Sequence, residues 1–125
     1  GQAGFNNLFR RYKNDAKRYG REFLLTSDQF RTLTSGDCRY CGTPPSQTST
    51  HSRGATTTER GYIYAAYPYN GIDRINNEQG YTTSNTVPCC QTCNFLKQEM
   101  STVDFLAAIT RVYAHLIKPT NLVPE

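Results

Sequence analysis

The sequence predicts a small α+β domain that is stapled by zinc. Two Cys-x-x-C pairs, Cys38 with Cys41 and Cys90 with Cys93, supply the four thiolates of a tetrahedral structural zinc. Amphipathic patterns predict a helix near each end of the chain, and short apolar segments between the cysteine pairs predict strands. The 125 residues suit a single domain with a zinc-stapled core over 38–100.

The first part of the chain, residues 1–37, is expected to form a helical extension. Apolar residues from Phe5 to Tyr19 recur mostly at spacings of three and four, which predicts an amphipathic helix that ends at Gly20. The segment 22–25 is expected to be extended.

The same extension holds the positive charge of the chain. The formal net charge is +4, and the first 24 residues carry all of this excess. A basic patch of this kind suits a phosphate backbone, and an ordinary solvated helix face is an equal alternative. The candidate DNA-binding residues here are Arg10, Arg11, Lys13, Lys17, Arg18 and Arg21.

A second helix is expected directly after this segment. Thr26 is followed three residues later by Gln29, which is the pattern of a capping box. The helix should run through Leu33, and Ser35 with Gly36 should end it.

The middle of the chain is expected to combine a loop with short strands. Residues 43–60 are rich in Thr, Ser, Pro and Gly and predict a loop. Segments 62–67 and 71–75 are expected to be extended, with a turn over 76–80. Residues 86–88 should form the return strand, whose pairing Pro88 should end.

Two helices are expected after the second cysteine pair. The first should start at Thr92 or Cys93 and reach Met100, and the second should occupy 101–118, with Pro119 closing it. The apolar face of the second consists of Phe105, Leu106, Ile109, Val112, Tyr113 and Leu116.

The use of cysteine favours metal over disulfides. Five cysteines are an odd number, and the first residues do not read as a signal peptide, so we expect an intracellular, cytoplasmic protein. Cys89 is then the spare cysteine, expected to be a small buried residue. No apolar run approaches the ~18 residues that span a membrane. A four-thiolate site is closed, so its zinc should have a structural role.

Chemistry would therefore require a second, harder metal. Asp73 is the natural oxygen ligand, and Asn94 is its candidate partner because it follows Cys93 at the start of a helix. A carboxylate and an amide oxygen leave open positions, as Mg²⁺ prefers when it also binds phosphate. Taken singly, a salt bridge explains Asp73 and a helix cap explains Asn94.

The stretch from Asn70 to about Leu106 resembles the HNH endonucleases, in particular their zinc-stapled, phage-type members. The resemblance covers roughly half of the chain, and Cys38 and Cys41 complete the zinc site of the family upstream. The residues that carry it are Asn70-Gly71-Ile72-Asp73-Arg74-Ile75, Gly80-Tyr81, Asn85, Val87-Pro88-Cys89-Cys90, Cys93-Asn94 and Lys97.

The resemblance implies a ββα-metal fold, also called a His-Me finger, in which two antiparallel strands and a helix surround one divalent ion. It implies that Asp73 is the first ligand of a catalytic Mg²⁺ or Mn²⁺, and that Asn94 is the second ligand. It makes Asn85 the residue that fixes the loop between the strands. Lys97 is counted with the candidate DNA-binding cations, and a virus or mobile element is the expected source.

Arg74 departs from the family, which usually has a general-base His at this position. A guanidinium stays protonated at neutral pH and cannot take a proton from water. Three accounts stay open. The metal activates water while Arg74 stabilises charge on the phosphate, or His51 or Tyr81 supplies the base, or the site binds DNA without cutting it.

The expected function is a metal-dependent DNA endonuclease that nicks or cleaves phosphodiester bonds, with Asp73, Arg74, Asn85 and Asn94 as its catalytic residues. The alternative is a non-catalytic, zinc-stapled DNA-binding module.

Overall fold

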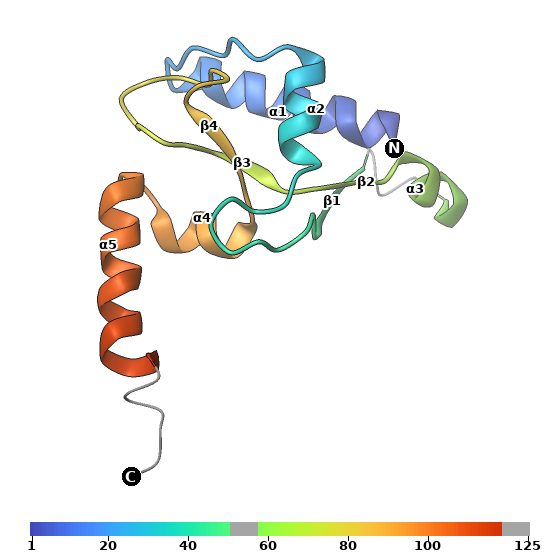
Figure 1. The fold of residues 1–125 in the computed structure, drawn as a ribbon. Coiled ribbons are helices and arrows are strands. Elements are labelled where there is room, and N and C mark those ends of the chain that lie inside the picture. The colour runs from blue at the N-terminus through green and yellow to red at the C-terminus, as the bar shows by residue number, and fades with distance from the viewer. Residues whose placement is uncertain (51–57, 119–125) are drawn as a thin grey trace.

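A computed structural model describes residues 1–50 and 58–118, and it confirms the predicted α+β fold (Figure 1). The helices are α1 (Gln2–Arg18), α2 (Ser27–Thr34), α3 (Glu59–Ala65), α4 (Gln91–Lys97) and α5 (Thr102–Val112), and a π-helical turn over Tyr113–Ile117 continues α5. The strands are β1 (Gln47–Ser49), β2 (Tyr67–Tyr69), β3 (Gly71–Arg74) and β4 (Thr86–Cys89). They form two separate antiparallel pairs, β1 with β2 and β3 with β4.

The N-terminal helix forms as its amphipathic pattern predicts. Its apolar face packs on the core, with Phe5 1% and Leu8 0% exposed, and only its last member, Tyr19, is exposed. The helix ends before Tyr19, and Gly20 follows with a φ of +68°, a left-handed conformation that favours glycine. The chain thereby turns back toward the hairpin of β3 and β4.

The predicted capping box at the start of α2 is also present. The Thr26 hydroxyl accepts a hydrogen bond from the Gln29 backbone N–H at 3.2 Å, and the Thr26 N–H donates to the Gln29 side chain at 2.9 Å. The N–H groups of Thr26 and Gln29 thus each have a hydrogen-bond acceptor at the start of the helix, where the helix backbone offers them none. This cap positions Phe30 at the centre of the core.

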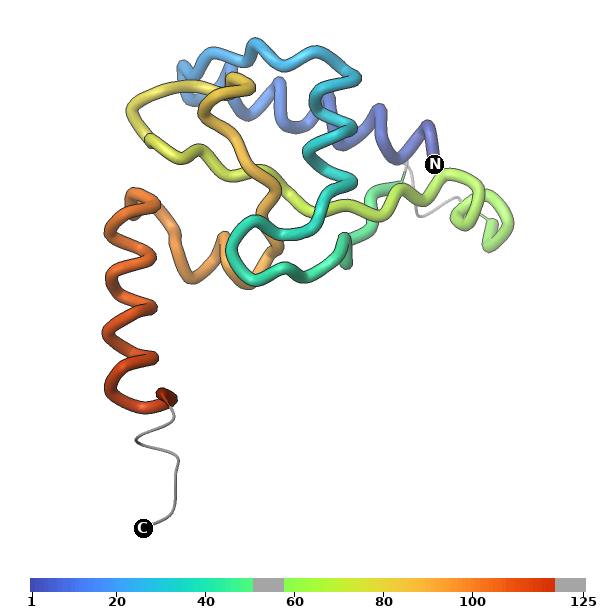
Figure 2. The backbone as a smooth tube through the Cα atoms, in the orientation of Figure 1, coloured from blue at the N-terminus to red at the C-terminus, as the bar shows by residue number. Residues whose placement is uncertain are grey.

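The core is mainly aromatic. Phe30 is fully buried, and its ring lies 5.1 Å from that of Phe9 and 5.3 Å from that of Tyr12, centroid to centroid. Ile72 brings β3 into the same cluster. Figure 2 shows the chain of α1 and α2 lying along one side of the β3–β4 hairpin, with α4 on the opposite side. The aromatic core therefore fixes one side of the hairpin.

Two expectations for the middle of the chain are wrong. Part of the predicted loop 43–60 forms β1, and part of the predicted extended segment 62–67 forms α3. The hydroxyl of Thr58 accepts a hydrogen bond from the Gly61 N–H at 3.1 Å and so starts a helix. Tyr62, Ile63 and Tyr64 are exposed, Tyr64 to 82%, and only Ala65 of α3 is buried, so most of the apolar run that resembled a strand does not contribute to the core.

Pro88 does not end the pairing of β4, contrary to expectation. Pro88 pairs with Ile72, and pairing continues to Cys89 opposite Gly71. A two-stranded sheet has only edge strands, where the missing N–H of proline leaves no ladder bond unmade. The Pro88 carbonyl accepts a hydrogen bond from the Arg39 N–H at 2.9 Å.

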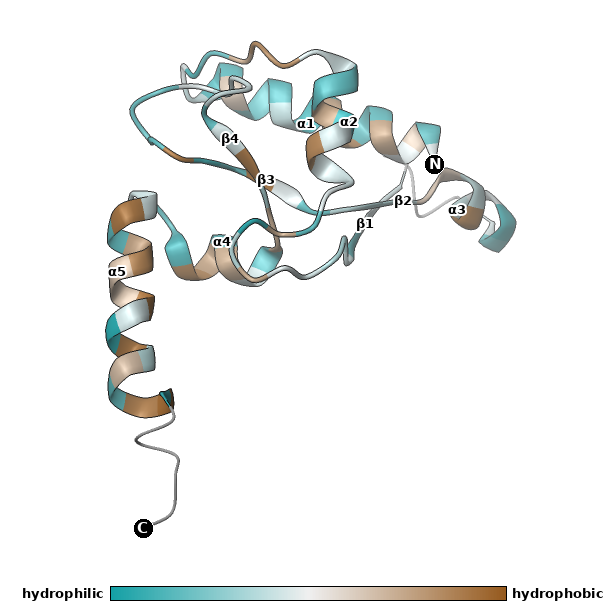
Figure 3. Cartoon of the chain, viewed as in Figure 1, coloured by the Kyte–Doolittle hydropathy of each residue, from teal (hydrophilic) through white to brown (hydrophobic). Residues whose placement is uncertain are grey.

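The helices after the second cysteine pair differ from expectation in their ends and in their packing. α4 ends at Lys97 and not at Met100, because Gln98 has a φ of +50°. Phe105 alone of the predicted apolar face of α5 is buried, and Figure 3 shows this helix projecting from the body with its apolar residues uncovered. Pro119 lies outside the described residues.

None of the described helices is long and apolar enough to cross a membrane.

The packing of α1 on the rest of the domain depends on Gly4. A Cβ placed there would meet the carbonyl oxygens of Ser49 and Ala65 at less than contact distance. We therefore expect Gly4→Ala to lower the free energy of unfolding by about 3 kcal/mol, measured by urea denaturation. The control is Asn14→Ala on the exposed face of the same helix, which should raise stability by about 0.5 kcal/mol. Equal stability of the two variants would contradict this packing.

Candidate functional site

Four cysteine side chains gather beside the β3–β4 hairpin. The Sγ atoms of Cys38, Cys41, Cys90 and Cys93 all lie within 4.8 Å of one another, and this cluster could hold a metal ion. Cys38 and Cys41 lie in the turn after α2, while Cys90 is the N-cap of α4 and accepts a hydrogen bond from the Cys93 N–H at 3.4 Å. Four thiolates at this separation fit a tetrahedral zinc, as the two sequence motifs predict.

The surroundings of Cys41 favour its thiolate form. The hydroxyl of Thr43 lies 3.0 Å from the Cys41 sulfur. Hydrogen bonds from Thr43 lower the pKa of the Cys41 thiol to about 6. Thiolate is the form that binds zinc, so Cys41 is ready to bind at neutral pH.

Cys89 lies outside the group of four and is 1% exposed, as expected of the spare cysteine. Burial raises the pKa of its thiol well above the ordinary range, which keeps it neutral.

The neighbouring pair Cys89 and Cys90 therefore offers a matched test. We expect Cys90→Ala to lose bound zinc and to unfold, because a structural zinc contributes on the order of 10 kcal/mol. Cys89→Ala should keep one zinc per chain and fold. Zinc content by atomic emission and folding by circular dichroism give the two readouts. Equal zinc in both variants would exclude Cys90 as a ligand.

Asn85 braces the loop between β3 and β4. Its side chain is buried, donates to the carbonyls of Asn76 at 3.0 Å and Gly80 at 2.8 Å, and accepts from the Asn76 N–H at 2.9 Å. Its own carbonyl accepts from the Ile75 N–H at 2.9 Å. All of these loop partners are backbone atoms, so one side chain holds both ends of the loop, as the resemblance implies.

Truncation of Asn85 should therefore be costly. Asn85→Ala leaves two carbonyls and one N–H of the loop without their partner, and we expect unfolding free energy to fall by about 3 kcal/mol. Asn94→Ala is the matched control, because Asn94 is exposed. Chemical denaturation of both zinc-loaded variants measures the difference. A loss of less than about 1 kcal/mol for Asn85→Ala would contradict the bracing role.

Asp73 lies at the end of β3 in a buried ion pair. Its carboxylate oxygens are 3.1 and 3.3 Å from Nζ of Lys97, and the hydroxyl of Tyr40 donates to it at 2.7 Å. Lys97 is 0% exposed and Asp73 is 6% exposed. Burial raises the pKa of Tyr40, so its hydroxyl stays protonated and can donate.

These contacts change the interpretation of two predicted site residues. Lys97 is not available to DNA, because its ammonium is buried against Asp73 and the Arg74 carbonyl. The expectation that Lys97 binds DNA is therefore wrong. Lys97 follows Cys93 by four residues and so shares the buried face of α4, but this spacing did not indicate which partner a lysine would meet there. Tyr40, missed in the sequence, could have been noticed from its position inside the first Cys-x-x-C pair.

The described residues do not fit a divalent ion between Asp73 and Asn94. The Asp73 carboxylate already engages Lys97 and Tyr40. Asn94 is exposed and lines a separate hollow with Gly71, Cys89 and Gln91, to which Asp73 does not contribute. Within residues 1–50 and 58–118, the grouping of three or more metal-ligating side chains is that of the four cysteines.

Arg74 is held by the loop that Asn85 braces. Its Nη1 donates to the carbonyls of Asn77 at 2.7 Å and Gln79 at 2.9 Å, and its guanidinium lies 5.5 Å from the ring centroid of Tyr81. Tyr81, one candidate base, thus faces a fixed cation and packs on Phe23. His51, the other candidate base, lies outside the described residues.

The predicted DNA-binding cations of the first segment lie on the surface. Arg10, Arg11, Lys13, Lys17 and Arg18 are exposed, and Arg21 is half-buried. Arg18 and Arg21 lie against the ring of Tyr19, at 5.6 and 5.1 Å from its centroid. The end of α1 is thus a basic surface that adjoins the β3–β4 loop.

Comparison with known proteins gives one sequence relative and one structural neighbour of note. No protein-family model matches the chain. The chain is 33% identical over 101 residues, or 81% of its length, to an uncharacterized protein of Acanthamoeba polyphaga mimivirus. It spans only 15% of the length of that viral protein.

The structural neighbour is the rare-cutting HNH restriction endonuclease PacI, with a TM-score of 0.54 and 21% sequence identity. The match covers 88% of this chain and 79% of that one. At this identity the likeness establishes the fold, and the chain thus has an HNH-endonuclease-like fold with a four-cysteine cluster that could hold zinc.

Proposed function

We propose that the chain is a DNA-binding domain of the HNH endonuclease type, stabilised by zinc. The observation that carries the proposal is the row of exposed cations on α1, which borders the β3–β4 loop of a nuclease-like fold. Such cations neutralise backbone phosphates and release condensed counterions, which gives affinity without a sequence requirement. The zinc acts here as a scaffold, because four thiolates leave no open coordination position.

Cleavage of DNA is the second candidate function. It is favoured by the hairpin, in which Asp73 lies near the end of one strand and Asn85 braces the loop, as the resemblance to HNH endonucleases implies. Hydrolysis would need a divalent ion, Mg²⁺ or Mn²⁺, with Asp73 as its ligand. The carboxylate of Asp73 would then have to leave Lys97, whose buried ammonium would lose its partner.

The contacts of Asp73 and Arg74 favour binding without cleavage over cleavage. Lys97 supplies the positive charge next to Asp73, and Arg74 cannot act as a general base. A DNA-binding domain would act on DNA in the same way with or without a divalent ion, whereas a nuclease of this type would cut DNA only with one.

One experiment separates the two functions. Zinc-loaded wild-type protein and Asp73→Asn are incubated with supercoiled plasmid and Mg²⁺ or Mn²⁺, and a labelled duplex reports binding. We expect salt-sensitive binding that is indifferent to these ions, with no nicking. Asparagine keeps the shape of the side chain but removes the charge that a divalent ion requires, and zinc content and circular dichroism verify that the variant folds.

Metal-dependent nicking by the wild type that Asp73→Asn loses would establish cleavage and overturn binding alone. Equal nicking by both proteins would point to a contaminating nuclease. Failure of the wild-type protein to bind the duplex at low salt would overturn the DNA-binding proposal.

A further inference from the structure

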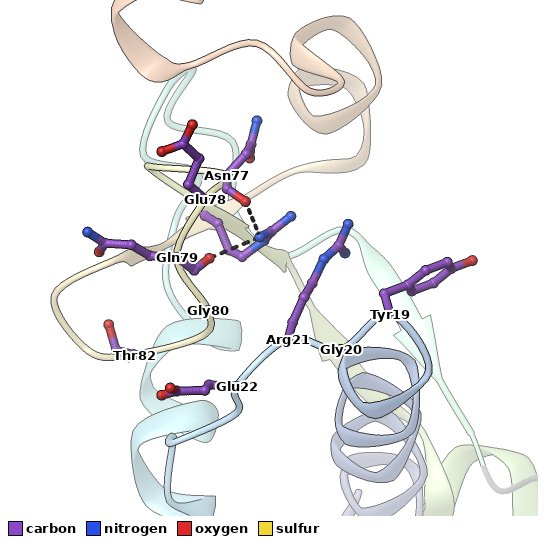
Figure 4. A pocket seen from close by; sticks show the side chains of 10 residues that line it. Tyr19, Gly20, Arg21, Glu22, Asn77, Glu78, Gln79, Gly80 and Thr82 are labelled. Atoms are coloured by element: carbon purple, nitrogen blue, oxygen red, sulfur yellow. Dashed lines mark hydrogen bonds between the residues drawn. The ribbon is translucent and has the colours of Figure 1, made fainter.

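A polar hollow of about 630 Å³ lies between the end of α1 and the loop that joins β3 to β4 (Figure 4). Tyr19, Gly20, Arg21 and Glu22 line it from the N-terminal side, and Arg74 with residues 77–80 lines it from the hairpin. Residues distant in sequence thus meet here, and two of them are arginines.

Backbone contacts fix the two sides of the hollow relative to each other. The Tyr81 N–H donates to the Glu22 carbonyl at 2.8 Å, and the Leu24 N–H donates to the Tyr81 carbonyl at 2.9 Å. A Cβ at Gly80 would come within 2.5 Å of the Glu22 carbonyl oxygen, so the loop approaches this closely only with glycine there. Backbone contacts of the fold therefore determine the position of both sides of the hollow.

The charges of the hollow are arranged unevenly. Glu22 and Glu78 also line the hollow, but Figure 4 shows their carboxylates pointing away from the side chain of Arg21, which reaches from the end of α1 toward the hairpin loop. Among the described residues the salt bridge joins Asp73 to Lys97, and neither Arg21 nor Arg74 forms one. Two guanidinium groups at one hollow that form no salt bridge favour an anion beside them.

Both arginines are positioned before any ligand arrives. Arg74 is held through Nη1 by two loop carbonyls, which leave the N–H groups of Nη2 and Nε for a ligand and the charge without a salt bridge. Arg21 lies against the ring of Tyr19 at 5.1 Å from the centroid, and Arg18 lies against the same ring. This pair of arginines on Tyr19 extends the basic surface of α1 to the rim of the hollow.

We infer that Arg21 and Arg74 together hold one phosphodiester group of a DNA backbone at this hollow. The inference rests on the proposed function and adds the place where the backbone enters the domain. A phosphate can offer oxygens to two guanidinium groups at once, and each guanidinium can donate two parallel hydrogen bonds to a pair of phosphate oxygens. Arg74, at the position of the usual general base, is then a residue that positions the backbone.

The test measures how the affinity of a labelled duplex of about 20 base pairs depends on KCl between about 50 and 200 mM. The proteins are the wild type, Arg21→Gln, Arg74→Gln and the double variant. Arg111→Gln is the matched control, because Arg111 is an exposed arginine on α5, which projects away from the hollow. Zinc content and melting temperature verify folding, and Arg21→Gln removes no hydrogen bond that holds the loop.

We expect the double variant to lower the slope of log affinity against log salt by about 0.9, the value for one phosphate. Its affinity should then fall about 3.5-fold less than that of wild type over this salt range. Arg21→Gln alone should weaken binding at the lower salt by about threefold, with Arg111→Gln unchanged.

A fall in slope of about 1.8 would show two separate phosphates and overturn the shared site. A double variant that behaves like Arg111→Gln would overturn the inference while the DNA-binding proposal stands. Absence of duplex binding by the wild type would instead overturn the proposed function itself.

Discussion

The fold depends on the clamp that four cysteines place on the chain. Each of its two sheets is a pair of strands with three or four residues, which is too little to be stable alone. The aromatic core covers one side of the β3–β4 hairpin, and the cysteine cluster joins the turn after α2 to the start of α4. Zinc at this cluster would close the segment 42–89 and so hold the hairpin and the helix in one unit.

The ion pair of Asp73 with Lys97 sets the electrostatics beside the clamp. A charge pair this deeply buried contributes little net stability, but loss of either partner leaves a costly unpaired charge. The ammonium of Lys97 neutralises the negative charge of the Asp73 carboxylate, which a bound metal cation would otherwise do. Tyr40 packs on Phe105 and donates to Asp73, so the same ion pair is linked to the only buried residue of α5.

Local chemistry in the sequence predicted much of the fold and part of the site. The cysteine spacing, the Thr26 capping box and the helical pattern after Phe5 each specify structure through neighbours a few residues away, and the structure confirms them. The chain from Glu59 to Ala65 misled the prediction, because tyrosines and isoleucine favour strands while a threonine cap imposed a helix. The burial of Lys97 depends on Asp73, which is distant in sequence, and spacing alone does not reveal such a contact.

The loop between β3 and β4 is held largely through its backbone atoms. Asn85 and Arg74 grip it through carbonyls and an N–H of Asn76, Asn77, Gln79 and Gly80. The geometry of the loop is therefore largely uncoupled from the side-chain chemistry at its tip. Residues 78 and 79 can change in charge and size while the backbone that orients Arg74 stays in place. Natural or engineered substitutions at residues 78 and 79 can thus change the side chains that the loop presents to a ligand without changing the backbone of the hairpin.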